Sequence, residues 1–445
     1  MSENRKPIIE PEFYKDFHCI GGQCSFTCCK EWKIAVDPET KKRWRKLSVP
    51  ETVLESGRVP KHACRSSLDK AQLSQFVMKK DGGEIIELLP NMRCPFLEDT
   101  ELCRLVLDYG EACLSETCHV FPRETHAFAD RTERTLVSCC PEIVDRLYVL
   151  KELHFTNLPY QDRAFLLEGK DKLFQIRNIM MYWLQDASVS NEVNLKRCLF
   201  MLLDLLDKKT KGMTLDPGEC LKEADVEKLT EMMLAMPKDT QAAIEEQNAL
   251  FLDITENYRK DGRYQGLLNP LYAMAEQLSR EFQEADAARM DVVCALHAEV
   301  VVAYAPLLRN YLVAEAFATL LIPGCTLQDM VLQLEWMIME YVLIVHAMVL
   351  EILCEKDTED VPGTSNSKED EGDAMSSESQ GAFDGRTYAA VTETVHAPLA
   401  YPKARELLIL IARMTGYDGD EIEEYLRDSF ENPVWPWGYA DYLLS

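Results

Sequence analysis

The sequence has little basic charge for its size and no glycine-rich nucleotide loop. It holds 48 Lys and Arg against 75 Asp and Glu, a net charge of −27 over 445 residues. Nucleic-acid binding is disfavoured because phosphate contacts need a basic face. The glycine pairs Gly21-Gly22 and Gly82-Gly83 belong to no G-x-G-x-x-G run, which disfavours a Rossmann-type cofactor domain.

The chain also lacks an apolar signal core at its start and a long apolar run free of charge. Its first residues, MSENRKPIIE, are polar, so we expect a cytoplasmic protein. The most apolar stretch is 330–353, and it contains Glu335, Glu340, His346 and Glu351. A spanning helix rarely tolerates that many ionisable groups, so this stretch predicts a buried core helix and no membrane insertion.

The negative charge is unevenly placed. Residues 1–150 are nearly neutral, with 22 Lys and Arg against 24 Asp and Glu, so the excess of acid lies in the rest of the chain. An acidic surface suits a lysine-bearing protein substrate, although it is equally typical of an acidic soluble protein of any function.

Cysteine is plentiful, and its distribution is informative. Eleven of the 16 cysteines lie in residues 1–140. A secreted scaffold would be small or would spread its disulfides, so clustered cysteines in a reducing cytosol indicate metal ligands or reactive thiols. The isolated cysteines are interpreted as small buried hydrophobes; they are Cys64, Cys198, Cys220, Cys294, Cys325 and Cys354.

Two cysteine groups predict a metal site. The first is Cys19-x4-Cys24-x3-Cys28-Cys29, in a glycine-containing loop. Thiolates are soft ligands that suit zinc, copper(I) or iron–sulfur clusters, and the spacing is not the paired C-x2-C of a zinc ribbon. We expect the second group to meet the first in space; it comprises Cys94, Cys103, Cys118 and Cys140, with Cys113 and Cys139 as extra thiols.

The pattern predicts a mainly α protein in which a small cysteine-rich module with minor β content precedes a large helical domain. Glu84–Leu89 is a candidate strand, and Asp37-Pro38 predicts a capped helix through Trp44. Pro306 is expected to kink or split a long helix. The expected parts are a module over 1–150, a helical domain over 151–354, a disordered acidic linker over 355–386 and C-terminal helices over 387–445 that pack on the body.

Several short motifs resemble the flagellin lysine-N-methylase family, within a wider group of CxxxxCC metal-chelating proteins. The first block comprises Tyr14, Phe17, Cys19-Ile20-Gly21, Cys24, Thr27-Cys28-Cys29, Trp32, Ile34 and Asp37. The second comprises Cys94-Pro95-Phe96-Leu97, Leu102-Cys103, Gly110-Glu111, Thr117-Cys118, Phe121-Pro122-Arg123 and Cys140-Pro141-Glu142. A weaker similarity is Leu308-Arg309-Asn310-Tyr311-Leu312.

The resemblance implies methyl transfer from S-adenosylmethionine to flagellin lysines, with an iron–sulfur cluster, of the 4Fe-4S type, or zinc as the alternative. Serine often replaces Cys139 in the family, and Cys113 lies off the pattern, so neither is expected to be a ligand. The implied ligands are Cys19, Cys24, Cys28, Cys29, Cys94, Cys103, Cys118 and Cys140.

Four residues beside the second group are candidates for the remaining chemistry. Tyr109 and Glu111 are catalytic candidates that would position the lysine amine or accept its proton. Arg123 and His119 are cofactor-binding candidates, with Arg123 placed to grip the carboxylate of the methionine moiety. The structural alternatives are a core role for Tyr109 and hydrogen bonds from His119 and Arg123 to the metal ligands.

Two other functions use the same cysteines. A non-enzymatic metal carrier would need the thiols but not the roughly 300 residues that follow them. A redox sensor cycling Cys28-Cys29 and Cys139-Cys140 is disfavoured, because a vicinal disulfide is strained and neither pair is a C-x-x-C. The large helical part favours an enzyme with a large substrate, and flagellin is the partner that the resemblance implies.

Overall fold

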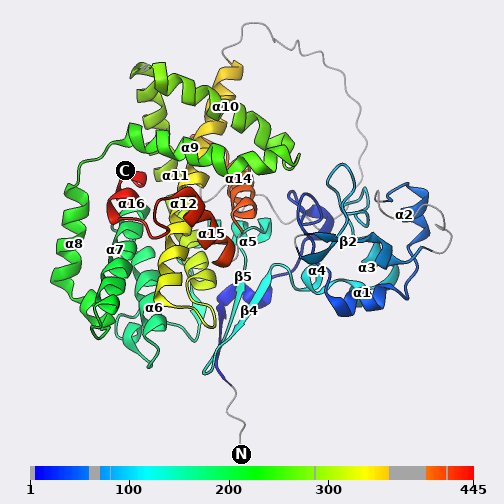
Figure 1. Ribbon diagram of the computed structural model, residues 1–445, viewed down its shortest axis with the longest axis horizontal. Helices are drawn as coiled ribbons and strands as arrows, with labels where there is room; N and C mark the ends of the chain where they lie inside the picture. The colour runs from blue at the N-terminus through cyan, green and yellow to red at the C-terminus, as the bar shows by residue number, and fades with distance from the viewer. Residues whose placement is uncertain (1–5, 60–70, 81, 285–286, 360–396, 417–418) are drawn as a thin grey trace, which may run out of the picture.

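The computed structural model describes residues 6–59, 71–80, 82–284, 287–359, 397–416 and 419–445. The protein is mainly α-helical with few strands, which confirms the predicted fold class. Figure 1 shows a large helical body and, to one side of it, a smaller part that carries α1 to α4. Cys64 and the predicted linker from residue 360 onward lie outside the described residues.

The body consists of long helices connected by short segments. Their order is α5 (Pro141–Val149), α6 (Lys172–Leu184), α7 (Asn191–Thr210), α8 (Glu223–Ala235), α9 (Thr240–Lys260), α10 (Gln265–Glu284), α11 (Ala287–Thr319), α12 (Leu327–Glu359), α14 (Tyr401–Met414), α15 (Gly419–Ser429) and α16 (Trp437–Leu443). Side-chain caps begin several of them: Asp171 caps α6 and Ser190 caps α7, as is typical of helix N-termini.

The two longest helices, α11 and α12, form the centre of the body. By length and apolarity alone, both helices could span a membrane, but core helices of other proteins are often as long and as apolar. In the most apolar 18-residue segment of each helix, 89% of the residues of α12 are buried inside the protein, against 33% for α11. The prediction of a buried core helix at 330–353 is therefore confirmed. Pro306 lies inside α11 without splitting it, and residues 355–359 extend α12 instead of starting a linker.

A four-stranded sheet connects the N-terminus to the body. Its order is β4-β5-β1-β6, with β1 parallel to β5 and the other pairs antiparallel. The strands are β1 (Ile8–Pro11), β4 (Arg123–Ala127), β5 (Thr132–Leu136) and β6 (Phe155–Thr156). Glu133 of β5 is fully buried and accepts two hydrogen bonds from Arg177 of α6, at 2.5 and 2.8 Å, so a paired buried charge anchors the sheet on the body.

The smaller part has its own hydrophobic core, which we call the small core; it runs from Ile34 to Cys113. Its helices are α1 (Pro38–Trp44), α2 (Glu51–Glu55), α3 (Arg104–Tyr109) and α4 (Glu116–Val120), and β2 (Val77–Lys80) pairs with β3 (Gly83–Ile86). Asp37 caps α1 with Pro38 at its first position, as predicted. Trp44 is fully buried, and its indole N–H donates to the Cys113 carbonyl at 2.8 Å.

The large core takes in the sheet as well as the helices. Ile9, Phe17, Leu136 and Ile143, which precede residue 150, pack in the large core and not in the small one. The small core thus ends at Cys113, before the predicted module boundary at residue 150. The sheet, although its strands come mostly from the first 150 residues, packs in the same core as the helices of the body. At the other end, Trp435 is 1% exposed, and its amide donates to the Glu335 carboxylate of α12 at 2.8 Å, so the segment after α15 packs on the body.

Candidate functional site

The two cysteine groups meet along a short antiparallel contact. The Cys94 amide donates to the Cys29 carbonyl at 2.8 Å, and the Glu31 amide donates to the Met92 carbonyl at the same distance. The backbones of Lys30 and Arg93, which lie between these two hydrogen bonds, form an antiparallel β-bridge. Because this bridge fixes Cys29 beside Cys94, residues 65 positions apart enter the same site.

Two short helices bring in the next pair of thiols. Cys103 is the residue before α3 and pairs in a bridge with Leu97. Cys118 lies in α4, and its amide donates to the hydroxyl of the capping residue Ser115 at 3.2 Å. Both thiols are partly buried, and helix starts position them where side-chain direction is well defined.

Cys140 completes the set from the side of the body. It directly precedes α5, whose first residue is Pro141, and its carbonyl accepts from the Val144 amide at 3.1 Å. The C-terminal end of α5 is held by Asn310 of α11, which donates to the Leu147 and Leu150 carbonyls at 3.0 and 2.8 Å. Asn310 belongs to the Leu308–Leu312 motif, so this part of the motif has a structural role.

Cys28 lies at the centre of the thiols. The charge of Cys28 raises the pKa of six other thiols, and the charge of Cys19 raises the pKa of Cys24. The six are Cys24, Cys29, Cys94, Cys103, Cys118 and Cys140. All eight predicted ligands therefore belong to one electrostatically connected group, which we call the thiol cluster. Cys19 is exposed, Cys94 and Cys140 are buried, and the other five are partly buried.

Burial keeps most of these thiols protonated. It raises the pKa of Cys118 and of Cys140 to about 12 in each case. Cys28 is the exception: a hydrogen bond with Cys29 lowers the pKa of Cys28 to about 7, against the opposing effect of burial, and Arg413 lowers it further. A metal ion binds thiolates and releases their protons, so neutral buried thiols are the state expected before metal binds.

The donor set fits a soft metal or an iron–sulfur centre in its chemistry, because it consists of thiols only. In the described part of the chain, however, no three His, Cys, Asp or Glu side chains are already arranged to hold a metal ion. The thiols therefore gather without forming a finished coordination shell. The residues that would hold a centre are the thiols around Cys28.

Arg413 of α14 clamps the first cysteine loop onto the body. It donates to the carbonyls of Phe26, Thr27 and Cys139 at 2.8, 3.1 and 3.3 Å. Its guanidinium also lies over the rings of Phe26 and Trp32, 4.4 and 4.8 Å from the centroids. An arginine with several donors in a fixed fork suits such a multiple contact.

Two further contacts support the clamp. Arg405 of α14 binds both carboxylate oxygens of Asp145 and donates to the Ser25 hydroxyl at 2.8 Å. The Tyr264 amide, just before α10, donates to the Glu31 carboxylate at 2.7 Å. Helices far along the chain thus hold the loop that carries Cys24, Cys28 and Cys29.

Three of the predicted catalytic and cofactor-binding residues, Tyr109, Glu111 and His119, lie on or next to α3 and α4 of the small part, whereas Arg123 lies on β4 of the sheet. Tyr109 is 37% exposed and its hydroxyl donates to the Ser48 carbonyl at 2.7 Å. Glu111 and His119 are exposed. Arg123 donates to the Phe17 carbonyl at 3.1 Å and lies over the Phe17 ring. Tyr109 and Arg123 thus already make structural contacts, and the proposed roles of all four stay predictions.

The cysteines that were set aside are placed differently from the cluster. Cys113 is buried in the small core, where its carbonyl holds Trp44. The buried Cys139 lies next to Cys140, with its carbonyl bound by Arg413. The later cysteines are on or next to helices of the body, and Cys198 is fully buried in the large core.

Sequence reasoning missed a second group of residues, next to Cys139. Glu315 and Tyr311 lie one turn apart on α11, and Glu340 faces them from α12. We call these three residues the acidic cluster. Burial, followed by the charge of Glu340, raises the pKa of Glu315 to about 8. The signal was present in the sequence, since a carboxyl group inside an apolar helix needs a partner or a function.

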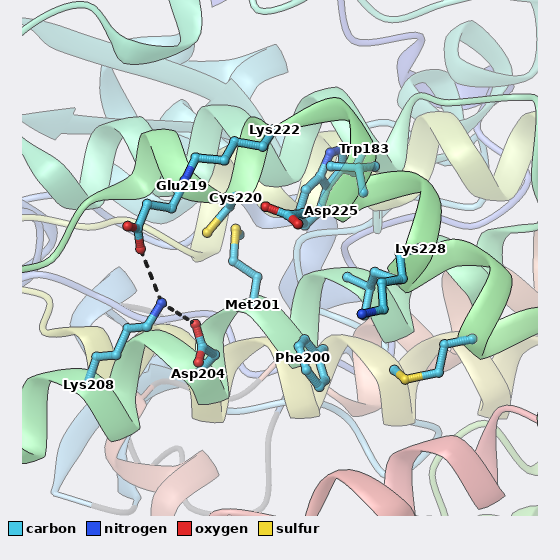
Figure 2. A pocket seen from close by; sticks show the side chains of 13 residues that line it. Trp183, Phe200, Met201, Asp204, Lys208, Glu219, Cys220, Lys222, Asp225 and Lys228 are labelled. Carbon is cyan, nitrogen blue, oxygen red and sulfur yellow. Dashed lines mark hydrogen bonds and ion pairs between the residues drawn. The ribbon is translucent and has the colours of Figure 1, made fainter.

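A pocket of about 420 Å³ lies elsewhere, between α7 and α8. Figure 2 shows Trp183, Phe200 and Met201 in its wall, with Lys208 bonded to Asp204 and Glu219 at one end. In Figure 1 these helices are on the side of the body away from α1 to α4. Because none of the eight cysteines of the thiol cluster lines it, this pocket has no part in the site described above.

The sequence of the protein is similar to curated bacterial proteins. It is 32% identical over 143 residues to the flagellar biosynthetic protein FliU of Salmonella muenchen, covering 76% of that protein and 32% of this chain. The chain belongs to the flagellin lysine-N-methylase family. Proteins named lysine-N-methylase from Salmonella choleraesuis and Salmonella typhimurium also match at 32% identity.

The similarity within the flagellin lysine-N-methylase family is partial. The match covers 32% of the length of each named lysine-N-methylase and 32% of this chain. No family model and no solved structure matches the chain. Membership of the family is thus carried by its sequence relatives.

Proposed function

We propose that this protein is a cytoplasmic lysine N-methyltransferase that uses S-adenosylmethionine to methylate flagellin, and that its thiol cluster holds an iron–sulfur centre. The observation that carries the proposal is the 32% identity to proteins named lysine-N-methylase. The flagellin substrate is supported by the name of the flagellar relative. The metal centre is supported by the eight thiols of the thiol cluster, in which Cys28 interacts with six others, and by the soft character of that donor set.

The attachment of the cluster to the body supports an enzyme over a metal carrier. A carrier must release its metal to a partner, so its ligands should lie on a loop that can open. Here Arg413, Arg405 and Tyr264 tie that loop to α14 and to the start of α10. Fixed ligands suit a resident centre that positions or supports a nearby reaction.

Methyl transfer and metal binding can be tested in one experiment. The protein is purified without oxygen and incubated with S-adenosylmethionine and flagellin, and intact-mass analysis follows mass steps of one methyl group per lysine. Cys28→Ala should lose most of the bound iron and sulfide, because Cys28 lies among six other thiols. The control is Cys294→Ala in α11, which should keep the metal content of the wild type.

The outcomes separate the functions. Methylated flagellin together with bound iron and sulfide supports the proposal as a whole. A colourless protein that holds only zinc would contradict the iron–sulfur centre. Bound metal without any methyl step on flagellin would favour the carrier, and equal metal loss from both variants would overturn the ligand assignment.

A further inference from the structure

The acidic cluster is unusual because its carboxyl groups have no cationic partner. Glu340 is 7% exposed and accepts a hydrogen bond from the Thr415 hydroxyl at 2.5 Å. Glu315 is partly exposed, and Glu124 on β4 is exposed and close enough to act on it. Among the residues that the structure describes, no Lys, Arg or His forms an ion pair with the carboxyl group of Glu124, Glu315 or Glu340. Carboxyl groups in such surroundings favour a positively charged guest.

Two buried hydroxyl groups next to the carboxyl groups have unused hydrogen-bonding capacity. Tyr311 is 1% exposed; its hydroxyl is close enough to Glu340 to lower the pKa of that carboxyl but has no partner in full hydrogen-bonding geometry. Ser138 is also 1% exposed, lies beside Glu315, and its hydroxyl likewise has no partner in that geometry. Buried hydroxyl groups are rarely left in this state, so they point to a ligand with hydrogen-bond donors.

The three carboxyl groups form a series that runs from exposed to buried. Glu124 is exposed, Glu315 is partly exposed and Glu340 is buried. Glu315 lies beside Cys139, whose neighbour in the sequence, Cys140, belongs to the thiol cluster. A lysine side chain has the chemistry that matches these groups, since its ammonium group has three hydrogen-bond donors and its stem is apolar.

We propose that Glu315, Glu340 and Tyr311 receive the ammonium group of the substrate lysine, guided past Glu124, and that Glu315 takes one proton from it. This inference rests on the proposed methyltransferase function and names the amine-binding part of its site. The proton moves from the lysine Nζ to a Glu315 carboxylate oxygen, which leaves a neutral amine with a free electron pair. S-adenosylmethionine would supply the methyl group: the electron pair of the amine forms the bond from Nζ to the methyl carbon, and the electron pair of the broken carbon–sulfur bond stays on sulfur.

The surroundings of Glu315 suit a proton acceptor at neutral to slightly alkaline pH. The groups that face it are Glu124 from β4, Ser138 and Cys139 before α5, Tyr311 on its own helix and Glu340 from α12. The charge of His126 acts to lower the pKa of Glu124, and the charge of Arg413 on α14 acts to lower the pKa of Cys139. A general base is most effective when its pKa lies near the working pH, and burial raises that of Glu315 to about 8.

The test compares Glu315→Gln with Glu335→Gln, both of which replace an enclosed carboxyl by an amide of the same shape. Glu335 lies on α12 outside the acidic cluster and accepts from the Trp435 amide at 2.8 Å. Glu315→Gln should lower kcat/KM for flagellin about 100-fold or more, the usual size of general-base catalysis. It should also remove the rise of kcat/KM with pH near 8. Glu335→Gln should keep wild-type kinetics, and both variants should keep wild-type metal content.

A binding measurement separates this inference from the methyltransferase function. The probe is N-acetyl-lysine amide, titrated into the wild type and followed by NMR. Tyr311→Phe removes a single oxygen and should weaken binding several-fold even if Glu315→Gln fails to fold. Wild-type kinetics and unchanged probe binding in Glu315→Gln would overturn the amine site and leave the methyltransferase intact. Glu315-dependent probe binding without methylation by the wild type would support the amine site and contradict the enzyme.

Discussion

The small core and the large core of this protein are built from different kinds of element. The small core is formed by turns, short strands and helices such as α1, which has 7 residues. The large core centres on α11 and α12, each 33 residues long. Short helices are marginal without tertiary support, so the small core depends on packing among its own elements and, in our proposal, on a metal centre.

The difference explains where the candidate chemistry lies. The thiols come from loops and helix starts, whose backbone can bend to bring sulfur atoms together, whereas the acidic cluster comes from rigid helices that hold unpaired carboxyl groups inside a core. Cys139 and Arg413 stand where the two kinds of structure meet. In our proposals, thiols on loops that Arg413 holds in place stand beside an amine site on rigid helices.

The largest expected effect tests whether the two cores unfold as separate units. Leu73 in the small core and Leu343 in the large core are both fully buried. Truncation to alanine should cost about 2–5 kcal/mol in each case, from lost burial and the cavity left behind. Leu73→Ala should raise hydrogen exchange only around residues 34–118, and Leu343→Ala should raise it throughout the helices. Equal effects of the two variants on both regions would show a single cooperative unit.

A smaller effect is expected from breaking the tie between the regions. Arg413→Gln removes the charged donors to the Phe26, Thr27 and Cys139 carbonyls and should cost about 2 kcal/mol. Hydrogen exchange should increase in residues 24–32 before it increases elsewhere. Arg427→Gln is the control, because Arg427 is exposed on α15 and is paired with Glu423. Unchanged exchange in the loop of Arg413→Gln would contradict the clamp.

The smallest expected effect is a pH dependence confined to the small core. Burial acts to raise the pKa of Asp37, but hydrogen bonds from Glu116 and Thr40 outweigh it and lower that pKa to about 2. The stabilisation is therefore present above the unfolded-state pKa of about 3.9 and is lost as pH falls towards 2. Because Asp37 is partly exposed, we expect a loss of about 1 kcal/mol.

Denaturant unfolding at pH 5 and pH 2.5 measures that loss. Asp37→Asn should lack this part of the pH dependence in the small core. Asp99→Asn, at an exposed acid of the same region, should keep the wild-type dependence. A pH dependence of Asp37→Asn equal to that of the wild type would show that the capping carboxylate is not its source.

Local features of the fold were predictable from the sequence. The cap at Asp37, helix α1 through Trp44 and the apolar core helix at 330–353 agree with the structure. Caps, periodicity and proline positions act over a few residues. Pro306 does not split α11, so of the two predicted effects the break is wrong and the kink stays a prediction. The family resemblance was equally visible, since it rests on short motifs.

The sequence by itself determined the mainly helical fold, the cysteine-rich N-terminal region and the family. Only the tertiary structure decided that Cys29 meets Cys94, that Arg413 clamps the first loop, and that Glu315 and Glu340 share a site. These contacts join residues 25 to nearly 390 positions apart. Their partners are chosen by how whole helices and loops pack, and no local pattern along the chain records that choice.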